Sequence, residues 1–197
     1  KASPEIQSKK PSNLKENALF RESLALIEAR DYKSAIKSIT QYLKRNDSSP
    51  EGYYLRGKSY HELGILDKAS ADYRKSIELA PSSSHKALNN NGLIYGEIKN
   101  FELAIQSFTK AIKTNPQSKE AYNNRGVAKA ASGDTKGAVK DFSKSITIDN
   151  TYLEPILNRS FVYEMRGQLD KACSDWKLAG RMGSQDARIW HKYQCRG

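Results

Sequence analysis

Residues 85–118, HKALNNNGLIYGEIKNFELAIQSFTKAIKTNPQS, and residues 119–152, KEAYNNRGVAKAASGDTKGAVKDFSKSITIDNTY, are two copies of one pattern. In both copies a glycine stands at position 8, an alanine at position 20 and a phenylalanine at position 24. A pattern that recurs at a fixed spacing of this length indicates a repeat architecture, in which each unit packs mainly on its neighbours.

The same register extends in both directions and defines five units, residues 16–49, 50–84, 85–118, 119–152 and 153–184. Position 20 is alanine in every unit, and position 24 is always large and apolar. These residues are Ala35, Ala69, Ala104, Ala138 and Ala172, followed by Ile39, Tyr73, Phe108, Phe142 and Trp176. Apolar residues within a unit follow helical spacing, and Pro81 and Pro116 end the second helix of their units. Each unit is therefore expected to be a pair of helices.

These recurring positions resemble those of the tetratricopeptide repeat family over residues 13–184. The resemblance implies an all-α fold, a right-handed superhelix (α-solenoid) of about five helix-turn-helix repeats. Residues 185–197 are expected to form a capping helix and tail, because the last unit of a stack otherwise exposes its core. Residues 1–12 are polar and contain two prolines, which predicts a disordered leader.

The composition of the chain limits the classes of protein to which it can belong. The chain has 197 residues, a net charge of +11 and 38 % hydrophobic residues, which is enough to bury a core. No apolar run is long enough for a transmembrane helix. Exposed positions of the second helices carry fourteen basic and four acidic residues. The excess charge therefore belongs to the outer, convex face, where it is either a solvated surface or a dock for a polyanion.

The sequence contains no convincing motif for catalysis or for binding a cofactor. Residues 52–59, GYYLRGKS, match the spacing of a phosphate-binding loop. They fall inside an expected helix, however, whose N–H groups are already hydrogen-bonded. His61, His85 and His191 lack the spacing of metal ligands. The sequence thus predicts no enzyme, no cofactor, no metal site and no small-molecule substrate.

Positions 7 and 23 change together among the units. Position 7 is arginine in units two, four and five, and these same units carry aspartate at position 23. The other two units have neither residue. A charge inside a stack needs a partner, so structural ion pairs are expected between the two helices. The pairs are Arg56–Asp72, Arg125–Asp141 and Arg159–Asp175.

The family resemblance implies a concave face, lined by the first helices, that takes extended peptides. Successive asparagines fall on this lining and form a ladder that can pair with peptide groups, because each side chain both donates and accepts. The alternative is that these amides bond neighbouring helices. The expected peptide-binding residues are Asn89, Asn90, Asn123, Asn124, Asn158, Tyr54, Leu93, Val127 and Phe161.

The expected partner is a protein or an extended peptide. Seven glutamates against two lysines line the groove, so its ligand should be neutral or basic. The predicted function is a non-catalytic peptide-binding scaffold. The alternative is a basic adaptor whose convex face docks on nucleic acid or an anionic envelope surface. Self-association is a further alternative.

Cys173 lies in the last unit and Cys195 on the expected cap. A disulfide between them would fasten the cap to the stack, and the alternative is two small buried apolar side chains. The ending ACSDW…HKYQC resembles the C-terminus of bacterial extracytoplasmic tetratricopeptide proteins. An extracytoplasmic location (periplasm or cell envelope) is therefore expected, since disulfides persist in oxidising compartments. A cytoplasmic location is the alternative.

Overall fold

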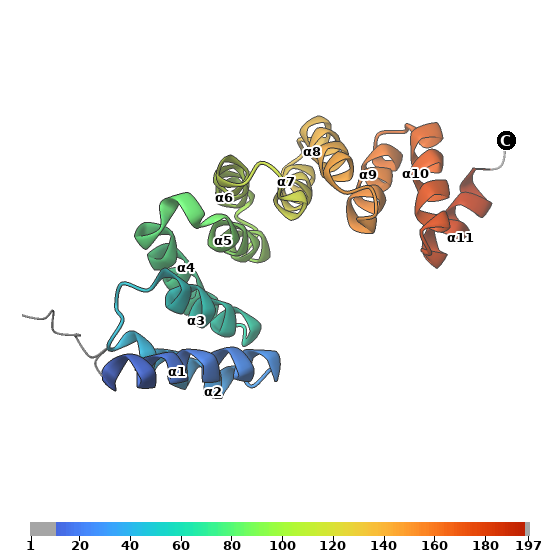
Figure 1. The fold of residues 1–197 in the computed structure, drawn as a ribbon. Helices are drawn as coiled ribbons and strands as arrows, with labels where there is room; N and C mark the ends of the chain where they lie inside the picture. Colours follow the sequence, from blue (N-terminus) through green and yellow to red (C-terminus); the bar gives the residue numbers. More distant parts are fainter. Residues whose placement is uncertain (1–10, 196–197) are drawn as a thin grey trace, which may run out of the picture. The chain divides into compact units, whose positions relative to one another are not determined.

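The computed structural model describes residues 11–195, which form eleven α-helices and a short 3-10 turn, with no strand among them (Figure 1). The predicted leader, residues 1–12, lies for the most part outside the described residues. Its last two residues begin the first helix, which starts at Pro11. The helices are α1 (Pro11–Glu28), α2 (Tyr32–Leu43), α3 (Pro50–Glu62), α4 (Leu66–Leu79), α5 (His85–Glu97), α6 (Phe101–Thr114), α7 (Lys119–Ala131), α8 (Thr135–Ile148), α9 (Leu153–Met165), α10 (Leu169–Arg181) and α11 (Gln185–Gln194).

The chain divides into two compact units. The N-terminal unit extends through Pro81 and contains α1 to α4, and the C-terminal unit begins at Ser82 and contains α5 to α11. Consecutive helices pack on one another within each unit. In the C-terminal unit α5 also contacts α7, and α7 contacts α9. The first helices of these repeats therefore lie side by side on one face, which we call the first-helix face. None of the described helices is long and apolar enough to span a bilayer.

Helix starts follow from short polar side chains at the N-cap. Ser118 Oγ accepts a hydrogen bond from the backbone N–H of Ala121 at the start of α7, and Asp134 Oδ1 accepts one from Gly137 at the start of α8. Such caps satisfy backbone donors that have no partner within the helix. Because capping serines, asparagines and aspartates recur between the repeats, the hairpin boundaries are set locally.

In units two, three and four, the hairpin core includes the contact between the position-8 glycine and the position-24 aromatic ring. Phe108 and Phe142 are almost completely buried. A Cβ atom added to Gly92 would lie 2.7 Å from the Phe108 ring, and one added to Gly126 would lie 2.6 Å from the Phe142 ring. These distances are too short for carbon atoms in contact. Glycine is therefore required here for close packing, because the aromatic ring of the second helix lies against the backbone of the first.

Substituting two glycines of α5 separates this packing constraint from helix propensity. Gly92→Ala should lower the free energy of unfolding by about 1–3 kcal/mol, because the methyl group overpacks against Phe108. Gly96 is in the same helix and has open space around it, so Gly96→Ala should raise stability by up to about 1 kcal/mol. Urea unfolding followed by circular dichroism measures both. Equal effects of the two substitutions would contradict the packing argument.

Candidate interaction surface

Three arginines form two-point ion pairs with aspartates of the neighbouring helix. Arg125 Nε lies 2.8 Å from one carboxylate oxygen of Asp141 and Nη2 lies 2.8 Å from the other. Arg159 and Asp175 pair in the same way, at 2.9 and 2.8 Å, in the geometry that makes guanidinium–carboxylate pairs strong. The hydrogen bonds with Asp175 raise the pKa of Arg159. Because these guanidiniums are engaged inside the repeats, they are structural.

Arg56 and Asp72 form the equivalent pair in the N-terminal unit, at 2.7 and 2.8 Å. The hydrogen bond with Asp72 raises the pKa of Arg56. Unit one has Glu22 and Ser38 at these positions, and there the serine hydroxyl donates to the glutamate at 2.9 Å. The same two positions therefore carry a polar contact between helices even where the ion pair is absent.

Each of these arginines also reaches the preceding repeat. Arg125 Nη1 donates to Thr109 Oγ1 at 3.2 Å, and Arg159 Nη1 donates to Ser143 Oγ at 2.9 Å. In the N-terminal unit Arg56 donates to Thr40 at 3.4 Å. All three hydroxyls stand at position 25 of the preceding unit. This pattern was visible in the sequence and was missed, because only positions within one unit were compared.

Removing one partner of a pair should be far more costly than replacing both. Arg159→Asn leaves the buried Asp175 carboxylate uncompensated, which should cost about 3–5 kcal/mol. Adding Asp175→Ser recreates the Asn–Ser combination that unit three holds at Asn91 and Ser107, and should recover most of the loss. Urea denaturation of both variants and of the wild type tests this. The pairing would be energetically unimportant if the single variant unfolded at the wild-type urea concentration.

The asparagine ladder bonds to itself across the first-helix face. Asn158 Nδ2 donates to Asn123 Oδ1 at 3.0 Å, which links α9 to α7. Asn124 Nδ2 donates to Asn89 Oδ1 at 3.1 Å, which links α7 to α5. Asn123 Nδ2 lies 3.5 Å from Asn124 Oδ1. Asn90, which follows Asn89 in α5, is half-buried. In the chain without a ligand, the asparagine amides therefore bond between neighbouring helices, as the alternative interpretation of the ladder states.

Part of the exposed surface of this face is apolar. Val127 on α7 and Phe161 and Met165 on α9 are 45 %, 60 % and 60 % exposed, and we call these three residues the apolar strip. They surround a cavity of about 390 Å³ whose floor includes Phe142. Asn158 lines the same cavity, so amide and apolar groups meet at one place.

Two other predicted groove residues are not part of the apolar strip. Leu93 is half-buried and packs against the core cluster of Ala104 and Phe108. Tyr54 belongs to the N-terminal unit, where its ring centre is 6.0 Å from that of Tyr73. The apolar strip is therefore confined to α7 and α9.

Charge on this face of the C-terminal unit is negative. At positions 2, 12 and 13 of α5, α7 and α9, which line the groove, the exposed charged side chains are one lysine and four acids. They are Lys86, Glu97, Glu120, Glu154 and Glu164. The second helices of this unit show the opposite balance, with eight exposed basic residues and two acidic ones. They are Lys110, Lys113, Lys136, Lys140, Lys144, Lys171, Lys177, Arg181, Glu102 and Asp170. The two faces thus favour ligands of opposite charge.

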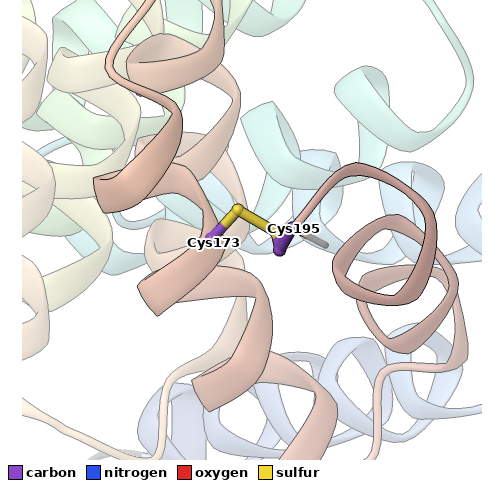
Figure 2. Close-up of a disulfide and its surroundings, with 2 residues drawn as sticks. All are labelled: Cys173 and Cys195. Atoms are coloured by element: carbon purple, nitrogen blue, oxygen red, sulfur yellow. A yellow bond between two sulfur atoms is a disulfide. The ribbon is translucent and has the colours of Figure 1, made fainter. Parts of the chain in front are cut away.

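A disulfide joins Cys173 on α10 to Cys195 at the end of α11, with 5.7 Å between the Cα atoms (Figure 2). Closing a loop of this length stabilises the folded chain by about 3 kcal/mol in the chain-entropy account. The only residue of α11 that is fully buried is Ala187. Because its own packing is limited, the bond to α10 is a main support of this helix.

Within residues 11–195 no cluster of histidine, cysteine or carboxylate side chains is arranged to hold a metal ion. The features that the C-terminal unit offers to a ligand are the apolar strip, the amides beside it and the acidic side chains around it. They suit recognition of another chain by burial, hydrogen bonding and charge.

Comparison with known proteins gives consistent matches. Three family models described as tetratricopeptide repeat match residues 20–84, 85–118 and 119–152. Tetratricopeptide repeat protein 36 of Danio rerio is 34 % identical over 107 residues, which is 52 % of this chain and 57 % of that protein. The chain thus spans little more than half of this relative.

Two solved structures share the fold at low sequence identity. MamA from Desulfovibrio magneticus RS-1 is 18 % identical with a TM-score of 0.79, over 87 % of this chain and 97 % of its own. YrrB, described as a TPR protein with an unusual peptide-binding site, is 16 % identical with a TM-score of 0.72, over 88 % and 90 % of the two chains.

Proposed function

The chain belongs to the tetratricopeptide repeat family, whose repeats serve as protein-interaction scaffolds, and we propose that its C-terminal unit binds a peptide segment of a partner protein. The binding surface is the first-helix face around Val127, Phe161 and Met165. The observation that carries the proposal is the exposure of these three large apolar side chains, between 45 % and 60 %, around one cavity. Neighbouring exposed apolar side chains around a cavity mark interaction sites.

The amides beside the strip supply hydrogen bonds to the peptide backbone. An asparagine side chain has two N–H groups and two acceptor lone pairs. The bonds that Asn124 and Asn158 make to Asn89 and Asn123 occupy only part of this capacity. Both residues are half-buried rather than enclosed, so a peptide lying along the face can reach them. The acidic side chains around the strip favour a neutral or basic segment.

Peptides selected from a random library displayed on phage, with the full chain as bait, test this function. Val127→Asp should weaken the selected peptides about tenfold or more, because it places a charge in the apolar contact. Leu103→Asp is the matched control, since Leu103 is a partly exposed apolar residue on α6, outside the first-helix face. Affinities measured by fluorescence anisotropy should be unchanged in the control.

The same measurement distinguishes a second candidate, in which the basic face of α6, α8 and α10 docks on a polyanion. Its support is the eight exposed basic residues on these helices. In that case duplex DNA or anionic vesicles would bind with a steep dependence on salt, and Lys140→Glu with Lys144→Glu would abolish binding. The groove proposal would be contradicted by ligands whose binding is lost in the Lys140→Glu, Lys144→Glu variant and is unchanged in Val127→Asp.

We also propose that the protein functions in an oxidising compartment. The support is the Cys173–Cys195 disulfide, which accounts for both cysteines of the chain, because such bonds are rare where thiols are kept reduced. A free-thiol assay on unreduced protein from its native source should find no reactive thiol. Two titratable thiols in that preparation would place the protein in a reducing compartment.

A further inference from the structure

The last helix, α11, begins in the same way as two first helices of the repeats, α3 and α7. Ser49, Ser118 and Ser184 cap α3, α7 and α11, and each accepts a hydrogen bond from the N–H three residues later. The residue at that third position is small and buried in each case, namely Gly52, Ala121 and Ala187. By this structural register α11 is a first helix rather than an unrelated cap.

The register places the apolar side chains of α11 at groove positions. Counted from the N-cap, Trp190 corresponds to Asn124 and Asn158, and Tyr193 corresponds to Val127 and Phe161. Ile189 corresponds to Asn123 and Leu157 in the same count. Ile189, Trp190 and Tyr193 are 51 %, 40 % and 70 % exposed. The apolar strip therefore continues from α9 onto α11.

The positions of α11 that would face a second helix of the same repeat are polar instead. In α7 the equivalent residues Arg125 and Gly126 contact α8, and in α11 they are His191 and Lys192. A missing second helix therefore does not explain why the apolar side chains of α11 are exposed. They belong to the side of the molecule that carries the strip.

A cavity of about 370 Å³ lies between α9 and α11. Phe161, Trp176, Trp190 and Leu157 form the apolar part of its lining, and the polar part is Asn158, Ser160, Glu164 and Gln194. The two indole rings are 6.2 Å apart between centroids and tilted by 53°. Phe161 also lines the neighbouring cavity beside Val127, so the two cavities share this ring.

We infer that α11 is a binding element of the groove, and that its cavity takes a bulky apolar side chain of the partner peptide next to a lysine or arginine. This inference rests on the proposed function and names the chemistry of the ligand. The apolar and aromatic lining fits the side chain, and Glu164 fits the neighbouring positive charge. That charge is also favoured by Glu154 and Asp186, which are exposed at groove positions of the same two helices.

The disulfide determines whether this site is formed. The bond holds the C-terminal end of α11 against α10, while the start of the helix is held by Ala187 and by a 2.7 Å hydrogen bond from Arg188 Nε to the Gly180 carbonyl. A helix of this length has little stability of its own. Breaking the bond therefore frees the half of the helix that carries Trp190 and Tyr193.

Tryptophan fluorescence reports directly on this site, because the only two tryptophans of the chain are Trp176 and Trp190 and both line the cavity. The probes are the library-selected peptides, remade without tryptophan, titrated into the full oxidised chain. They should carry phenylalanine, leucine or another bulky apolar residue beside a lysine or arginine, and should change the emission on binding. Replacing that apolar residue by alanine should weaken them about tenfold or more.

Variants on α11 complete the test. Ile189→Ser combined with Tyr193→Ser should weaken the same peptides about tenfold or more, and both residues are exposed enough for the fold to tolerate the change. The control is Leu178→Ser, an exposed apolar position on α10 outside the groove, which should leave the affinity unchanged. Cys195→Ser, or reduction of the wild type, should reproduce the loss, and the Cys195→Ser protein should no longer respond to reductant.

The outcomes separate this inference from the proposed function. One outcome would support the groove proposal and overturn the role of α11. In it, the peptides lose affinity for Val127→Asp but bind the α11 double variant and the reduced protein as tightly as they bind the wild type. Selected peptides without bulky apolar residues would overturn it as well. A library that yields no binder, or binders insensitive to every groove variant, would contradict both.

Discussion

In units two, three and four, the contact between the position-8 glycine and the position-24 aromatic ring is the constraint on which the packing of the hairpin depends. In the second hairpin of the C-terminal unit, a Cβ on Gly126 would lie only 2.6 Å from the Phe142 ring. This lets the ring cover the backbone of the first helix, and it fixes how close the two helices come. Every other feature of a repeat is arranged around that distance, because closely packed interiors tolerate little change in volume.

Polar side chains then determine how one repeat sits on the next. The guanidinium of Arg159 joins Asp175 of its own hairpin to Ser143 of the preceding one, and Asn158 bonds Asn123 across the first helices. Apolar packing is poorly directional, whereas these bonds require particular positions and orientations. The contacts between repeats therefore combine apolar burial, as where Val162 joins the cluster of Phe142, with polar bonds that fix position and orientation.

The sequence predicted the all-α repeat fold because its strongest signals, Ala104 and Phe108 among them, are local and periodic. It indicated the arginine–aspartate pairs because positions 7 and 23 change together within a unit. The bonding between Asn124 and Asn89 was left open, since an amide in a sequence does not reveal what it faces. The register of α11 was hidden because Ser184 comes two residues sooner after Tyr152 than the repeat spacing predicts.

The first-helix face changes in character along the C-terminal unit. Position 9 is Leu93, Val127 and Phe161 in successive repeats and Tyr193 in α11, and the exposed apolar surface grows in that order from a half-buried leucine to a tyrosine that is 70 % exposed. The amides follow the opposite order, since asparagine at position 6 gives way to Trp190. In the proposed binding mode, hydrogen bonding to a peptide backbone would therefore be concentrated near α7, and side-chain recognition near α11. A peptide on this face would be held along its length by the amides and selected at one end by the aromatic site.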